Sequence, residues 1–150
     1  MSVAGETCDR DRFASYVQRN LAWNKYKNGY SLGLEDVAQF VRSTLAEALR
    51  SGPYQVNILL GGIDEEGTSR LYWLDYLGTL QEVVKGAHGH AGYFVSSTLT
   101  NAYKPGMTVE EGKEAVKACA TELRTRYLID CPLFYAKILT KGKEMEVIEI

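Results

Sequence analysis

The chain has 150 residues, of which 45% are hydrophobic and 24% charged, and its formal net charge at pH 7 is -2. This length and apolar content predict one domain, residues 1–150, with a substantial core and no Pro/Gly/Ser-rich linker. The near balance of charge argues against nucleic acid or an anionic membrane surface as a partner. No apolar run approaches the roughly 20 residues of a membrane span, so we expect proteins or small molecules as partners.

The cysteine pattern indicates the redox compartment. The chain contains three cysteines, which are Cys8, Cys119 and Cys131. An odd number without CxxC spacing is typical of reduced thiols and not of a disulfide framework. The sequence also shows no apolar segment of the kind found in signal peptides. We therefore expect the protein in the cytoplasm and the nucleus.

Hydrophobic periodicity predicts two helices early in the chain. The first, within 9–26, has an apolar stripe that consists of Phe13, Tyr16, Val17 and Leu21. Asn28-Gly29 suits a left-handed cap after it. The second helix follows i, i+3, i+4 spacing through Val37, Phe40, Val41, Thr44, Leu45, Ala48 and Leu49. Ser51-Gly52-Pro53 is expected to end it.

The period changes to two after Pro53 and predicts a group of strands. Apolar and polar residues alternate from Tyr54 to Leu60, which is typical of a strand with one drier face. The turn residues from Asp64 to Gly67 lead into a second strand, 70–76, so these two segments are expected to form a hairpin. A third short strand is predicted over 80–84.

The last part of the chain predicts two more helices and a second hairpin. A short helix is expected over 93–101, and Thr108 with Glu111 three residues later matches a capping box that opens a longer helix ending near Arg126. Residues 133–141 and 143–150 are predicted to form the closing hairpin. The order of two helices, three strands, two helices and two strands indicates an α+β fold, with helices layered on a mainly antiparallel sheet.

Three motifs occur in a fixed order along the second half of the chain. They are Asp75-Tyr76-Leu77-Gly78-Thr79, Gly86-Ala87-His88-Gly89, and the stretch from Tyr103 to Gly112. Each is weak alone, but together and in this order they resemble the second half of a proteasome β subunit, most closely the non-catalytic β4 type. The opening residues from Ser2 to Glu6 resemble the fifth strand of that family, where it runs into the first long helix.

The resemblance implies a specific architecture. It is the four-layer αββα sandwich of the N-terminal nucleophile hydrolase type, of which residues 1–150 would cover the fifth strand to the C-terminal hairpin. It also implies that the strands carrying the catalytic threonine, aspartate and lysine of active members are absent, so the fold is expected to be truncated at its N-terminus.

The resemblance further implies a subunit without catalytic activity. Active members carry Gly-Ser-Gly where this chain has His90 between Gly89 and Ala91, and an aspartate and a serine where it has Tyr127 and Asp130. Gly5 matches the glycine whose backbone N–H acts as oxyanion donor, but such a donor stabilises nothing without a nucleophile. Removal of Met1 would expose Ser2 as an N-terminal nucleophile, which we disfavour because the family's nucleophile comes from a different strand.

Other candidate sites have weaker support. His88 and His90 lie two residues apart and could be combined with Cys119 or Cys131 as metal ligands, but their spacing matches no known zinc pattern. Cys119 falls on the apolar face of its predicted helix and is interpreted as a small core residue. Gly61-Gly62 lacks the lysine and hydroxyl residue of a phosphate loop. We predict neither a metal nor a cofactor.

The implied function is structural, in ATP- and ubiquitin-dependent protein degradation. The resemblance implies partners in the β ring, including the catalytic β5-type subunit, in the α ring and in the opposite β ring. An aromatic-rich edge could form a wall of a neighbour interface or of a small-molecule inhibitor site; the candidates are Tyr16, Trp23, Tyr26 and Tyr30.

Two other functional classes stay open. In one, the chain belongs to a catalytic threonine-type peptidase subunit whose nucleophile lies in a missing upstream segment. In the other, it is an unrelated soluble α+β interaction domain. The mass of the native assembly distinguishes a proteasome particle from a monomer or small oligomer.

Overall fold

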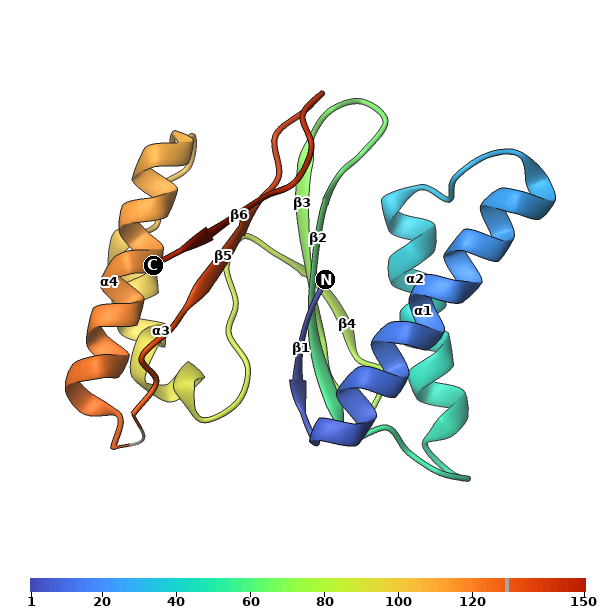
Figure 1. Cartoon of the computed structure of the whole chain (residues 1–150), viewed down its shortest axis with the longest axis horizontal. Coiled ribbons are helices and arrows are strands. Elements are labelled where there is room, and N and C mark those ends of the chain that lie inside the picture. Colours follow the sequence, from blue (N-terminus) through green and yellow to red (C-terminus); the bar gives the residue numbers. More distant parts are fainter. Residues whose placement is uncertain (129) are drawn as a thin grey trace. The chain divides into compact units, whose positions relative to one another are not determined.

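In the computed structural model, which describes residues 1–128 and 130–150, ten helices and strands follow the order that the sequence predicts, with one short strand ahead of the first helix. They fall into two compact units, Met1–Val84 and Lys85–Ile150, which we call the first and second units (Figure 1). The expectation that residues 1–150 form a single domain stays a prediction. None of the helices formed by the described residues has the length and apolarity to cross a membrane.

The first unit is built on a four-stranded sheet. Its strands are β1 (Ser2–Gly5), β2 (Val56–Ile63), β3 (Ser69–Leu74) and β4 (Leu80–Val83), and they are hydrogen-bonded in the order β1-β2-β3-β4. All neighbours are antiparallel. The predicted hairpin is therefore confirmed, with Ile58 opposite Leu74 and Ile63 opposite Ser69.

Two helices cover one face of this sheet. They are α1 (Thr7–Asn28) and α2 (Leu34–Ala48), drawn in blue and cyan in Figure 1. The alternating positions predicted for β2 point into the core beneath them, which contains Phe13, Val17, Ala38, Val41, Leu45, Val56, Ile58, Leu60, Tyr72 and Leu74. Full burial of a large apolar side chain stabilises a fold by about 1.5–3 kcal/mol, so this core holds the first unit together.

Helix α1 is longer than predicted at both ends. It begins at Thr7 and not at Asp9, because the Glu6 carboxylate accepts hydrogen bonds from the backbone N–H groups of Cys8 and Asp9 and thus caps the first turn. At its other end the helix runs to Asn28, two residues beyond the predicted range, and the predicted left-handed cap is confirmed: Gly29 has a φ of 80° and its N–H donates to the Lys25 carbonyl.

The opposite face of the sheet is also apolar. Because successive side chains of a strand alternate between faces, the register places a second set of residues away from the two helices. Leu59 lies opposite Trp73, and Leu71 lies opposite Val83. All four are only half-buried. The sheet of the first unit thus presents apolar side chains on both faces.

The second unit packs two helices against a short hairpin. Helices α3 (Ala91–Ala102) and α4 (Val109–Arg126) lie side by side, and β5 (Tyr135–Ile138) pairs with β6 (Glu146–Glu149). The predicted strands 133–141 and 143–150 were too long, since a turn spans the residues between them and Lys143 N–H donates to the Thr140 carbonyl. Arg124 joins α4 to the hairpin by donating to the Ile150 carbonyl at 2.8 Å.

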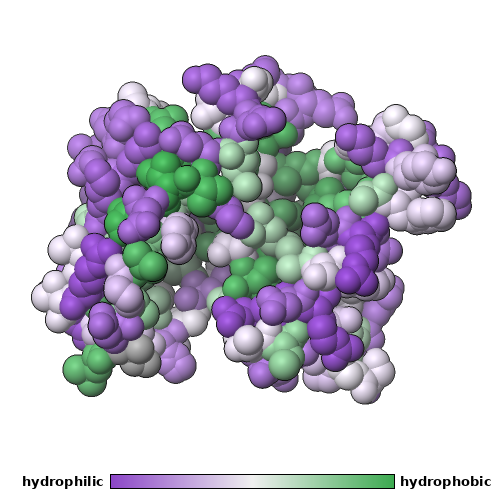
Figure 2. Space-filling model, viewed as in Figure 1, coloured by the Kyte–Doolittle hydropathy of each residue, from purple (hydrophilic) through white to green (hydrophobic). Residues whose placement is uncertain are grey.

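The core of the second unit is small. Its buried apolar residues among those described are Val95, Ala115 and Ala120. Large apolar side chains stay exposed, and Figure 2 shows green patches over the part of the view that α4, β5 and β6 occupy. The exposed members in this unit include Tyr93, Val116, Leu133, Tyr135, Met145 and Val147. Exposed apolar area of this kind is typical of an interaction surface.

Candidate functional site

The four aromatic residues predicted as an edge all lie on α1 or just after it, but they do not form one wall. Trp23 stacks on Tyr26, with ring centroids 5.9 Å apart and planes inclined by 29°. Tyr16 stacks on Phe40 of α2 at 6.3 Å and 15°. Tyr30 lies beyond the glycine cap of α1. The structure therefore makes two aromatic pairs, and the sequence interpretation missed Phe40 as a member.

Helical spacing explains the first pair. Residues three apart on a helix lie on neighbouring turns and can contact each other, so Trp23 and Tyr26 meet without help from another element. The pair is exposed: 62% of Trp23 and 83% of Tyr26 is accessible to solvent, as is 62% of Tyr30. Large aromatic side chains left in water are the residues that give protein interfaces their binding energy.

The second aromatic pair corrects the predicted core of α1. Tyr16 was placed in the apolar stripe with Phe13 and Val17, which are both buried. In the structure 42% of Tyr16 is exposed, and its ring covers Phe40 at the surface. Phe13 and Val17, four residues apart, face the core, whereas Tyr16 between them faces α2.

A cavity of about 270 Å³ lies beside the Trp23–Tyr26 pair. It is formed by the second half of α1, the connection to α2 and the first part of α2. The residues that line it are Asn20, Leu21, Trp23, Asn24, Lys27, Asn28, Leu32 and Phe40. This cavity was not predicted from the sequence. Asn20, Asn24 and Asn28 nevertheless repeat every four residues, so they form one polar line along α1.

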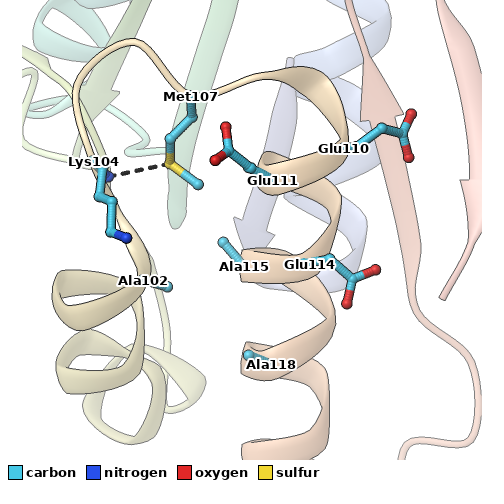
Figure 3. A pocket seen from close by; sticks show the side chains of 8 residues that line it. All are labelled: Ala102, Lys104, Met107, Glu110, Glu111, Glu114, Ala115 and Ala118. Carbon is cyan, nitrogen blue, oxygen red and sulfur yellow. Dashed lines mark hydrogen bonds between the residues drawn. The ribbon is translucent and has the colours of Figure 1, made fainter.

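A second cavity, of about 460 Å³, lies in the second unit at the end of α3 and the start of α4 (Figure 3). Its floor is apolar and consists of Ala102, Met107, Ala115 and Ala118. The carboxylates at its rim already have structural roles. Glu111 completes the predicted capping box with Thr108, and Glu110 and Glu114 pair with Lys113 and Lys117.

The charges around this cavity confirm those roles. Hydrogen bonds from the backbone and hydroxyl groups of Thr108 hold the pKa of Glu111 below its usual value. The hydrogen bond to Glu110 raises the pKa of Lys113. Both groups therefore keep their charges near neutral pH, and neither is adjusted to exchange a proton there, as a general acid or base would be.

Of the four positions that the sequence resemblance matches to functional residues, Gly5 and Tyr127 have structural roles here. Gly5 has a φ of 132°, and a Cβ at this position would overlap the Gln55 carbonyl oxygen. Tyr127 ends α4 and packs edge-on against Phe94, with centroids 5.5 Å apart. His90 is exposed at the start of α3 and makes no capping hydrogen bond, and Asp130 is exposed.

The histidines and cysteines weighed as metal ligands are not brought together. Among residues 1–128 and 130–150, no three His, Cys, Asp or Glu side chains gather closely enough to hold a metal ion. Cys119 is partly buried, and burial raises the pKa of its thiol. A thiol with a raised pKa is a poor nucleophile at neutral pH, in agreement with its interpretation as a small packing residue.

Comparisons with a family model and with known proteins both find proteasome subunits. A family model described as "Proteasome subunit" matches residues 1–130. The chain is 43% identical to "Proteasome subunit beta type-2-A" of Arabidopsis thaliana, over 94% of this chain and 69% of that protein. It is also 43% identical to "Proteasome subunit beta type-4" of Saccharomyces cerevisiae, over 94% of this chain and 72% of the relative.

Proposed function

Because the chain belongs to the proteasome subunit family, we propose that it is a non-catalytic β subunit of the 20S core particle, with a structural role in ATP- and ubiquitin-dependent protein degradation. The observation that carries the proposal is the 43% identity to proteins named β type-2 and β type-4 over 94% of the chain. Family membership excludes an unrelated α+β interaction domain.

The absence of catalysis is supported by what the chain's own residues do. An N-terminal nucleophile needs a base and charged neighbours that hold its amine and the developing oxyanion. At the positions where active relatives carry a serine, an aspartate and a second serine, this chain has His90, Tyr127 and Asp130. Tyr127 is engaged in packing with Phe94. The catalytic alternative is therefore not favoured.

We also propose the four-layer αββα sandwich for this chain. A sheet in the middle of such a fold needs apolar side chains on both faces, one for a helix layer and one for the second sheet. The first-unit sheet has this property, with Ile58 and Leu74 facing the helices and Leu59 and Trp73 facing away. Within the second unit, α4 likewise packs against strand β5.

In the proposed role, the chain holds its neighbouring subunits at the angle that a closed ring requires. Subunits of a closed ring join heterologously, so each member must present two different patches at the correct angle. The partners proposed are the ring neighbours, including the catalytic β5-type subunit, the α ring and the opposite β ring, in the cytoplasm and nucleus. The exposed aromatic residues of α1 and the apolar surface of the second unit provide candidate patches.

Affinity purification of the tagged full chain under native conditions tests this proposal. Co-purification with a complete set of proteasome α and β subunits, at the mass of the full core particle, is the expected result. A chain that elutes as a monomer or small oligomer, without other proteasome subunits, would contradict it.

A further inference from the structure

Two arginines of α1 have no partner within the described chain. Other arginine side chains are bonded to groups of the protein; they are Arg10, Arg42, Arg70, Arg124 and Arg126. Arg12 and Arg19 are exposed, and among residues 1–128 and 130–150 neither makes a hydrogen bond or an ion pair. A guanidinium group offers five N–H donors in a planar fork, so both side chains are free to bind an anion from outside the chain.

The helix places these two side chains on either side of one serine. Ser15 lies three residues after Arg12 and four before Arg19. Residues at these spacings are neighbours on a helix surface, with about 5–6 Å between their Cβ atoms. The Ser15 hydroxyl has no hydrogen-bond partner among the described residues, unlike that of Thr44, which donates to a carbonyl one turn earlier. Three side chains that can donate hydrogen bonds therefore share one face of α1.

A cavity of about 450 Å³ lies at this face of α1. The residues that line it are Asp11, Arg12, Ser15, Tyr16, Arg19, Asn20 and Tyr54. Packing fixes both tyrosine rings, because Tyr54 meets Phe13 edge-on at 5.0 Å and Tyr16 stacks on Phe40 at 6.3 Å. Where rings held in this way exclude water, the attraction between opposite charges is stronger than in bulk solvent.

The charges of the lining select an anion. The two arginines contribute two positive charges and Asp11 contributes one negative charge, so positive charge is in excess. Asp11 does not neutralise Arg12, since adjacent residues of a helix do not face each other and no ion pair joins them. The net charge of -2 gives the chain no broad basic surface for nucleic acid. A carboxylate is the anion that protein surfaces offer, and its two oxygens match the guanidinium fork.

We propose that Arg12 and Arg19 bind the carboxylate of an aspartate or glutamate on a neighbouring proteasome subunit, with the Ser15 hydroxyl as a third donor. The residues that flank this acidic side chain lie against the Tyr16 and Tyr54 rings. The inference rests on the proposed function, because it needs a neighbouring subunit. It assigns an acidic partner group to a surface that the family relationship leaves unspecified.

Competition for places in the particle tests the role of the two positive charges. A tagged Arg12→Gln/Arg19→Gln chain is co-expressed with the untagged wild-type chain; glutamine suits a helix nearly as well as arginine. Its share of the purified core particle should fall about tenfold or more relative to a tagged wild-type chain, because the carboxylate of the neighbour loses its cations. Arg12→Lys/Arg19→Lys keeps the charges and should keep most of its share.

Two single variants serve as matched controls. Arg50→Gln removes an exposed arginine that also has no partner among the described residues, and it should keep its full share. Asp11→Asn removes the carboxylate of the lining and should keep or raise its share, because it no longer repels the incoming acidic side chain. Depletion of either control to the extent of the double glutamine variant would overturn the proposal.

Zero-length crosslinking identifies the partner group directly and does not depend on the competition. In intact particles Arg19→Lys supplies an amine, and a carbodiimide joins this amine to a contacting carboxylate by an amide bond while the reagent takes up the water that is released. Mass spectrometry should find position 19 joined to an aspartate or glutamate of another subunit. Arg50→Lys is the control and should not be joined to that peptide.

The outcomes separate this contact from the proposed function. If the wild-type chain is absent from the particle, the proposed function fails. If the wild-type chain is present but the double glutamine variant enters equally well, the carboxylate contact is wrong. A lack of crosslinks at position 19, or crosslinks only to carboxylates of this chain, overturns the contact as well.

Discussion

The backbone at Gly5 lies so close to the Gln55 carbonyl that a Cβ at position 5 would overlap its oxygen. This contact joins the end of β1 to the residue just before β2, and the Glu6 N–H donates to the same carbonyl at 3.0 Å. Gly5, which the sequence resemblance matches to the oxyanion donor of active members, therefore has a structural requirement of its own.

Substitution of this glycine should be costly. Gly5→Ala combines a positive φ with the overlap at Gln55, and we expect it to lower the free energy of unfolding by at least about 2 kcal/mol. Chemical denaturation monitored by tryptophan fluorescence measures it. Gly112→Ala is the control: position 112 is helical with open space around a Cβ, so this variant should be neutral or stabilising by up to about 1 kcal/mol. Equal effects of both substitutions would disprove the structural account of Gly5.

The capping box of α4 predicts a pH dependence. The folded-state pKa of Glu111 is lowered by the backbone and side chain of Thr108. Its contribution to stability is therefore present above the unfolded pKa of a glutamate and is lost as the pH falls through the folded value. Glu111→Gln should melt at a lower temperature than wild type at pH 7, and the difference should shrink towards pH 3. A difference that is constant with pH would rule out this linkage.

The contact between Phe94 and Tyr127 predicts what happens when the residue of active relatives is restored. Tyr127→Asp should destabilise the chain by about 1 kcal/mol or more through loss of the aromatic pair, without producing peptidase activity. Tyr127→Phe keeps the ring and should be close to wild type. The measurements are thermal melting and cleavage of fluorogenic peptides by the purified chain. Activity in the Tyr127→Asp variant would overturn the non-catalytic assignment.

The three thiols should react in an order set by burial. All three should be reduced, so that denatured protein gains three adducts with an alkylating reagent. In the native chain we expect exposed Cys8 to react first and Cys119 last, because burial both shields this thiol and raises its pKa. Time-resolved alkylation followed by peptide mass spectrometry gives the order, and early labelling of Cys119 would argue against its packed position.

The aromatic edge should influence the neighbouring active site if it forms part of a shared wall. Alanine at Tyr16, Trp23, Tyr26 and Tyr30 together should lower a peptidase activity of the intact particle or the affinity of an active-site ligand. Separate Trp23→Ala/Tyr26→Ala and Tyr16→Ala variants tell which of the two stacked pairs is responsible. Unchanged activities and affinities in all of these particles would show that the edge has no such role.

Much of the fold could be predicted because its signals are local. The change of period near Tyr54, the Gly29 cap and the Thr108–Glu111 box each depend on residues close in sequence, and all three are confirmed. The family resemblance relied on motifs of the same local kind. The start of α1 was predicted two residues too late because a glutamate is a less usual N-cap than serine, threonine, aspartate or asparagine.

The cavity beside Asn24 could not be predicted because it depends on tertiary packing. Its lining joins residues of α1 to Leu32 and Phe40, and periodicity assigned Phe40 only to the core side of α2. The pairing of Tyr16 with Phe40 has the same origin, since it depends on where α2 packs against α1. The strands β5 and β6 are shorter than predicted because the turn between them is longer than the sequence pattern indicated.

The central claim, a subunit that belongs to the proteasome but has no catalytic site, is tested most directly by activity-based labelling of the purified native particle. An epoxyketone or vinyl-sulfone probe for N-terminal threonine is added to particles containing the tagged chain, and each subunit is analysed by mass spectrometry. We predict that other β subunits carry the probe while this chain is present and unlabelled. A probe adduct on this chain would contradict the claim. Particles whose other subunits are labelled but which lack this chain would contradict it as well.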